Sequence, residues 1–186
     1  MCGIVAHLGT ENSIEIVLEG LKRLEYRGYD SSGISFLSHE KKDLELFKRE
    51  GKLENLKEVL SGEDRESEVC IGHTRWATHG KVNDINAHPH RFDNISIVHN
   101  GIVENDGDLR NYLRESGFEV KSETDTETFL GLLIVNQKSS SSFLEAVSKS
   151  FKQIEGNSAF VILNKDTEEL VAVKRGAPLV CGETND

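Results

Sequence analysis

The sequence predicts an α/β fold with layered, largely antiparallel sheets. Apolar stretches of strand length lie toward both ends of the 186-residue chain, and helical patterns lie between them. Several neighbouring strand candidates are joined by hairpin-length connections, which antiparallel pairs can use and parallel pairs cannot. An apolar content of 37% is enough for a sizeable core, so we expect residues 1–186 to form one compact domain.

The strand candidates are short apolar runs or alternating stretches. Residues 2–8 and 69–75 are apolar runs typical of buried strands. Residues 34–37 and 43–50 are separated by a charged turn and predict a hairpin. The remaining strand candidates are residues 95–101, 159–163, 169–173 and 178–181.

The helix candidates are marked by their first residues. In a capping box, a Ser, Thr or Asn side chain and an acidic side chain three positions later close the first turn reciprocally. Three such pairs are present: Asn12 with Glu15, Thr124 with Glu127, and Ser142 with Glu145. The helices that they open are expected to end near Tyr26, Gln137 and Ile154. Two further helices are expected at residues 52–60 and 106–116, the second ended by Gly117.

The composition and charge indicate which binding partners and which cellular compartment to expect. A net charge of −10 would repel nucleic acid and anionic membranes, so we expect neither as a partner. No apolar run approaches the roughly 20 residues that span a bilayer, and no targeting leader is evident. Cys2, Cys70 and Cys181 show neither a metal-ligand spacing nor an even disulfide set. We therefore expect a protein of the reducing cytoplasm.

The amino terminus carries the first candidate for catalysis. If Met1 is removed, the thiol of Cys2 and a free α-amine belong to one residue. An α-amine with a pKa of about 8 is suited to accept the thiol proton, so one residue could be both nucleophile and base. The alternative is a small buried cysteine at the start of a strand.

The stretch from Trp76 to Phe92 has neither a helical nor a strand period and is rich in Gly, His, Asn and Thr, as active-site loops are. Five of the seven histidines lie in or near it: His73, His79, His88, His90 and His99. A metal site is one interpretation, but no HExxH or CxxC spacing supports it, so no metal is expected. Serine-hydrolase and phosphate-binding motifs are also missing from the sequence.

Other polar residues each allow two interpretations. Arg75 ends a strand candidate and is either a clamp for a substrate carboxylate or a surface arginine. Asn100 and Gly101 form either a hairpin turn or a pair of donors for a developing oxyanion. Asp125, in the first turn of a helix, either holds a substrate ammonium or is an ordinary helix-start aspartate.

Six segments in a fixed order bear a resemblance to a known family. They are MCGIV (1–5), LEYRGYDSSG (24–33), HTRWATHG (73–80), NAHPH (86–90), VHNGIVEN (98–105) and SETDTE (122–127). The chain resembles the glutaminase domains of class II glutamine amidotransferases. The motifs YRGYDS, HTRWATHG and SETDTE are most similar to those of the glutamine–fructose-6-phosphate aminotransferase branch, rather than to those of the amidophosphoribosyltransferase or asparagine synthetase branches.

The resemblance implies a fold and a reaction. The fold would be a four-layer αββα N-terminal nucleophile hydrolase sandwich with two antiparallel sheets. The reaction would be hydrolysis of L-glutamine to glutamate and ammonia without a cofactor. Ammonia would pass to a sugar-phosphate isomerase domain that makes glucosamine 6-phosphate. We expect this isomerase half to lie outside the 186 residues, and it could also carry an oligomer interface. The family motif continues beyond residues 175–180, so we expect the domain to be truncated at its C-terminal end.

The resemblance also implies roles for individual residues. Cys2 would be the nucleophile, and the Asn100 side chain and Gly101 N–H would form the oxyanion hole. Arg75 would bind the α-carboxylate of glutamine and Asp125 its α-ammonium. Trp76, Thr78 and His79 would complete the pocket, Trp76 would gate the ammonia passage, and Arg27 would lie near the amino terminus. The alternatives are a non-catalytic amino-acid-binding domain of this fold and the glutaminase half of another branch.

Overall fold

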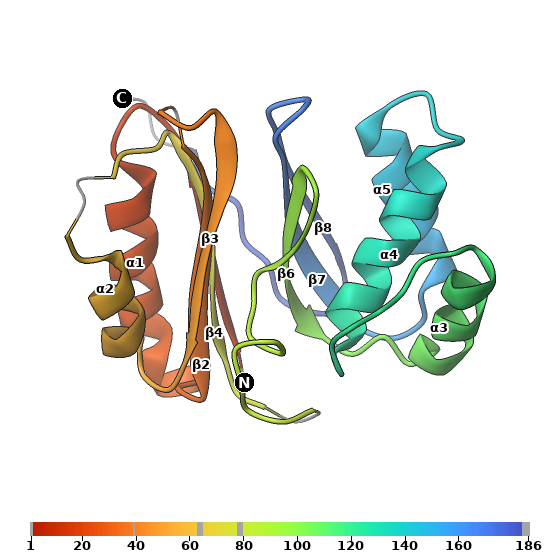
Figure 1. Ribbon diagram of the computed structural model, residues 1–186, viewed down its shortest axis with the longest axis horizontal. Helices are drawn as coiled ribbons and strands as arrows, with labels where there is room; N and C mark the ends of the chain where they lie inside the picture. Colours follow the sequence, from red (N-terminus) through yellow and green to blue (C-terminus); the bar gives the residue numbers. More distant parts are fainter. Residues whose placement is uncertain (1, 39, 63–64, 78–79, 184–186) are drawn as a thin grey trace.

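Two four-stranded antiparallel sheets form the centre of the computed structural model, which describes residues 2–38, 40–62, 65–77 and 80–183 (Figure 1). The first sheet has the order β1 (Gly3–Leu8), β4 (Val69–Arg75), β2 (Ser31–Ser38), β3 (Asp43–Glu50). The second has the order β5 (His90–Phe92), β6 (Ile95–Gly101), β7 (Ser158–Asn164), β8 (Glu169–Arg175). All pairings between neighbouring strands are antiparallel.

Helices cover the outer face of each sheet. The first sheet is covered by α1 (Ser13–Leu24), which continues into the short 3₁₀ helix η1 (Glu25–Arg27), and by α2 (Leu53–Leu60) (Figure 1). The second is covered by α3 (Asp106–Glu115), α4 (Asp125–Gln137) and α5 (Phe143–Gln153) (Figure 1). The order of layers is therefore αββα, as expected. None of the described helices is long and apolar enough to cross a membrane.

The core consists of one apolar layer between the sheets and one beneath each set of helices. β4 is buried on both faces, which explains why apolar residues occupy adjacent positions in its first half. Ile71 packs between the sheets with Val98 and Val161, whereas its neighbour Cys70 packs beneath the helices with Leu21. Adjacent residues of a strand point to opposite faces, so both must be apolar here.

Most predicted elements are confirmed. The bounds of β3, β4, β6 and α4 coincide with the predicted ranges. β2 begins at Ser31 rather than residue 34, because small buried serines continue the pairing with β3 and β4. The three-residue β5 was not predicted. The predicted strand 178–181 is wrong, since these residues follow the turn at Gly176 and pair with no described strand; Val180 is 93% exposed.

The capping predictions have mixed outcomes. The Asn12 side chain accepts a hydrogen bond from Ile14 N at 3.2 Å, and the Ser142 hydroxyl accepts one from Glu145 N at 3.1 Å. The Thr124 box is wrong, because the Thr124 hydroxyl hydrogen-bonds His90 Nε2 at 2.8 Å and caps no N–H of α4. The Thr124 hydroxyl therefore bonds a residue distant in sequence instead of the first turn of its own helix.

Candidate active site

A cavity of about 280 Å³ opens where β4 and β6 end and α4 begins. Its lining includes five of the predicted site residues: Cys2, Arg75, Trp76, Gly101 and Asp125. The register of the first sheet explains why Cys2 lies close to Arg75. Gly3 pairs with Thr74, which places Cys2 beside the end of β4. Thr78 and His79 lie outside the described residues.

Cys2 Sγ lies against the backbone that leaves β4. The N–H of Trp76 donates to the sulfur at 3.3 Å, and the sulfur is 3.6 Å from the Trp76 carbonyl oxygen. Half-buried at the cavity, this sulfur can reach a bound molecule.

The segment after η1 supports the backbone around Cys2. A Cβ at Gly28 would lie 2.7 Å from the carbonyl carbon of Arg75, so only glycine permits this close approach. Asp30 N donates to Arg75 O at 3.0 Å, and Asp30 Oδ2 accepts from Ala77 N at 2.8 Å. Arg27 ends η1 beside this contact and does not line the cavity. Asp30 was not singled out in the sequence analysis.

Arg75 places a guanidinium in the wall of the cavity. The residue is 5% exposed, and its Nη1 donates to Lys81 O at 3.3 Å. Burial lowers the pKa of Arg75, while the nearby acidic groups of Cys2, Asp30 and Asp125 oppose the shift. The guanidinium stays charged, and its planar fork of N–H groups matches the geometry of a carboxylate.

A reciprocal contact ties the loop after β4 to the segment before α4. Glu123 Oε2 accepts hydrogen bonds from Asn86 Nδ2 at 2.8 Å and from Lys81 N at 2.9 Å. In return, Asn86 Oδ1 accepts from Glu123 N at 2.9 Å. This pair holds the loop beside Asp125, and neither Asn86 nor Glu123 was predicted as a site residue.

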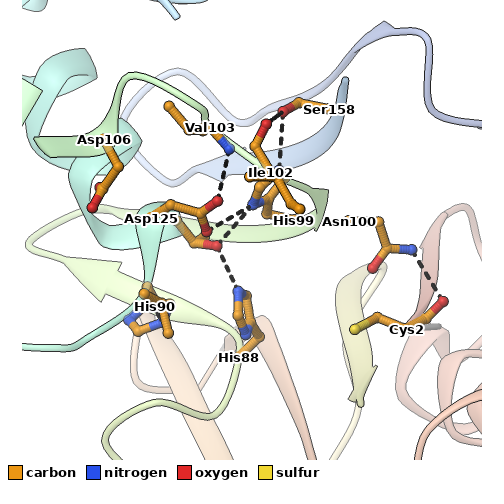
Figure 2. A network of polar contacts seen from close by, with 12 residues as sticks. Cys2, His88, His90, His99, Asn100, Ile102, Val103, Asp106, Asp125 and Ser158 are labelled. Atoms are coloured by element: carbon orange, nitrogen blue, oxygen red, sulfur yellow. Dashed lines mark hydrogen bonds and ion pairs between the residues drawn. The ribbon is translucent and has the colours of Figure 1, made fainter. Parts of the chain in front are cut away.

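The last residues of β6 present hydrogen-bond donors near Cys2. Asn100 Nδ2 donates to Cys2 O at 3.3 Å (Figure 2). Because Ile102 N donates to Asn157 O, the alternation of an antiparallel ladder directs the Gly101 N–H away from β7. Gly101 has φ +135°, and a Cβ there would lie 2.1 Å from Asn157 O, so this backbone requires glycine.

Asp125 is the first residue of α4 and faces the cavity from the opposite side (Figure 2). Its Oδ2 accepts from Val103 N at 2.8 Å, and its Oδ1 is 3.4 Å from His99 Nδ1. Burial would raise the pKa of Asp125, but the contacts with His99 and the Val103 N–H outweigh burial and lower it. The ionised carboxylate is suited to an ammonium group.

Comparisons with known proteins identify the family. The model of a family described as "Glutamine amidotransferase domain" matches residues 73–185. The chain belongs to this family. This amidotransferase domain is 46% identical over 185 residues to the glutamine–fructose-6-phosphate aminotransferases [isomerizing] of Clostridium perfringens (strain 13 / Type A) and Helicobacter pylori (strain J99). Both matches cover 98% of this chain but only 30% and 31% of those relatives, so the chain spans under a third of their length.

Solved structures agree with this assignment. The B. subtilis glutamine phosphoribosylpyrophosphate amidotransferase, complexed with ADP and GMP, superposes with a TM-score of 0.74 at 25% identity. The match covers 89% of the amidotransferase domain and 35% of that chain. The predicted N-terminal nucleophile hydrolase fold is therefore confirmed.

Three described histidines of the predicted cluster, His73, His88 and His99, line the cavity of the amidotransferase domain, and the ring of His90 lies 4.8 Å from that of His88. His88 Nε2 and His99 Nδ1 contact the Thr126 hydroxyl at 2.7 and 3.0 Å. Burial lowers the pKa of His73 to about 3 and the pKa values of His88 and His90 well below their usual range, so these rings are neutral at pH 7. Among the described residues, no three His, Cys, Asp or Glu side chains are arranged to hold a metal ion.

Proposed function

We propose that this amidotransferase domain hydrolyses L-glutamine to glutamate and ammonia, with Cys2 as the nucleophile. The observation that carries the proposal is the arrangement of one cavity: a cysteine sulfur, a buried guanidinium and a carboxylate with a lowered pKa share its lining. An α-amino acid carries a carboxylate and an ammonium, so Arg75 and Asp125 complement its two charges. The side-chain amide of glutamine would then extend toward Cys2.

The reaction follows from the groups near the sulfur. With Met1 removed, the α-amine of Cys2 accepts the thiol proton, and the sulfur attacks the carboxamide carbon of glutamine. Asn100 Nδ2 and the Gly101 N–H donate to the oxyanion of the tetrahedral intermediate. The α-amine returns the proton to the leaving nitrogen, so ammonia departs and a γ-glutamyl thioester remains on Cys2. Water then attacks the thioester, which releases glutamate and restores the thiol.

Substrate recognition should depend on both charged residues. We expect Arg75→Ala and Asp125→Ala each to lower kcat/KM for glutamine by roughly 10- to 150-fold, because each removes a charge-assisted contact worth about 1.5–3 kcal/mol. Steady-state assays of glutamate release measure this effect. Arg23→Ala is the control, since that side chain is 77% exposed on α1, and it should change kcat/KM by less than about twofold. Unchanged kcat/KM in both site variants would rule out these roles.

The wider role follows from the named relatives. We propose that the ammonia serves a sugar-phosphate isomerase domain in a longer cytoplasmic enzyme that makes glucosamine 6-phosphate. Trp76 supports a gating role, because it is 42% exposed at the cavity and contacts Tyr29 edge to face at 5.5 Å. Thr78 and His79 would complete the glutamine pocket, and Arg27 would lie near the amino terminus.

This wider role predicts the products of the 186-residue chain. Incubated with glutamine and fructose 6-phosphate, the chain alone should form glutamate and free ammonia, and added isomerase domain should yield glucosamine 6-phosphate. Glucosamine 6-phosphate made by the chain alone would contradict this division of labour. Glutamine binding without any release of ammonia would instead indicate a non-catalytic amino-acid-binding domain.

A further inference from the structure

His73 connects β4 to the residue proposed to stabilise the oxyanion. The ring is 1% exposed, and its Nε2 lies 3.0 Å from His99 O and 3.1 Å from Asn100 Oδ1. A carbonyl oxygen can only accept a hydrogen bond, so Nε2 must carry the hydrogen that reaches His99 O. The same N–H therefore faces Asn100, and the Asn100 atom on that side must be the acceptor oxygen.

The other end of the Asn100 carboxamide is fixed by the same logic. Its Nδ2 faces the carbonyl oxygen of Cys2 at 3.3 Å, and that oxygen also only accepts (Figure 2). A reversed carboxamide would place NH₂ against an N–H of His73 and oxygen against the carbonyl of Cys2. An amide nitrogen carries two hydrogens, so one can contact Cys2 O while the other remains for the oxyanion.

We propose that His73 is a positioning residue that turns the nitrogen of the Asn100 carboxamide, rather than its oxygen, toward the oxyanion formed when Cys2 attacks. This inference rests on the proposed glutaminase function. The neutral ring suits the task over a wide pH range, because burial lowers the pKa of His73 to about 3. Its orientation is supported by His88, whose ring stacks on it with centroids 4.4 Å apart.

Variants of His73 separate this role from simple packing. His73→Leu removes the donor, and we expect kcat to fall about 10- to 100-fold while KM changes less than about threefold, as for a contact made in the transition state. His73→Gln keeps an amide N–H near the position of Nε2 and should retain kcat within about fivefold. His73→Asn is shorter and cannot reach Asn100, so it should behave like His73→Leu. If His73→Leu fails to fold, the comparison of His73→Gln with His73→Asn still tests the inference.

Two controls distinguish positioning from structural damage. His90→Leu replaces another buried ring of the cluster, one that contacts Thr124 and not Asn100, and should change kcat by less than about threefold. Alkylation of Cys2 by iodoacetamide, measured on the Cys2 peptide by mass spectrometry, forms no oxyanion. Its rate should stay within about twofold in His73→Leu, whereas glutamine turnover falls.

A double-mutant cycle completes the test. Asn100→Ala alone should lower kcat by about 10²–10³-fold, and adding His73→Leu should cost almost nothing further, since His73 acts through Asn100. The inference would be overturned if the loss of kcat in the double variant equalled the product of the two single losses. It would also be overturned if the alkylation rate fell together with kcat. An active parent chain with an equally active His73→Leu variant would overturn this inference alone. A parent chain without glutaminase activity would overturn the proposed function as well.

Discussion

Cys2→Ala is expected to reduce glutamine turnover to background, a loss of about 10⁴-fold or more, because the variant lacks the only thiol in the cavity lining of the described residues. The other two cysteines cannot replace it. Complete burial raises the pKa of the Cys70 thiol, which keeps it protonated, and Cys181 lies exposed outside the cavity. Release of glutamate and ammonia by purified variants measures the effect.

Matched cysteine variants control this result. Cys181→Ala should retain turnover within about twofold, because it removes an exposed thiol that contacts neither the cavity nor Cys2. Cys2→Ala should keep the folded structure and its affinity for glutamine, since Arg75 and Asp125 remain. Turnover in Cys2→Ala above about one hundredth of the parent value would refute the nucleophile assignment.

Acidification from pH 7 to pH 5 is expected to lower the free energy of unfolding by about 2 kcal/mol through His73 alone, and further through His88 and His90. His73, His88 and His90 are buried, and burial lowers their pKa values in the folded protein below the usual 6.5. The unfolded chain therefore binds protons first as pH falls, so stability that is complete above about pH 6.5 is lost below it. His73, with a pKa of about 3 in the folded protein, contributes about 2 kcal/mol between pH 6.5 and pH 5, against a typical total stability of 5–15 kcal/mol. His88 and His90 lower the stability in the same direction.

Urea unfolding at pH 7, 6 and 5 measures this loss. The decline should continue toward the pKa of about 3 for His73, and protonation of Asp125, whose pKa is also lowered, adds to it below about pH 3.8. His90→Leu removes one of the buried rings, so its free energy of unfolding should fall less steeply as the pH decreases. A free energy of unfolding that is constant between pH 7 and pH 5 would contradict the neutral buried cluster.

The parts of the site that are local in sequence could be predicted. Cys2 precedes β1, Arg75 ends β4, and Asn100 with Gly101 ends β6, so strand patterns and sequence motifs place all of them at strand ends. The structure confirms that Cys2, Arg75 and Gly101 line one cavity together with Asp125. Asn100 is not part of this lining, but its side chain contacts Cys2 O.

The supporting contacts could not be predicted, because they join segments far apart in the chain. Asp30 reaches Ala77 across 47 positions, and Asn86 reaches Glu123 across 37. Both pairs look like ordinary loop residues in the sequence. Thr124 was predicted wrongly for the same reason. Its local sequence fits a capping box, but its hydroxyl hydrogen-bonds His90, which lies 34 positions away in the chain.

The central claim is that Cys2, with a free α-amine, forms a covalent thioester with the γ-glutamyl group of glutamine. The direct measurement is acid quenching of the chain during turnover, followed by digestion and mass spectrometry of its cysteine peptides. We predict that Met1 is absent and that the peptide beginning at Cys2 alone carries one γ-glutamyl group, which disappears when glutamine is exhausted. A chain that hydrolyses glutamine while uniformly retaining Met1, or that carries the group on Cys70 or Cys181 instead, would contradict the account.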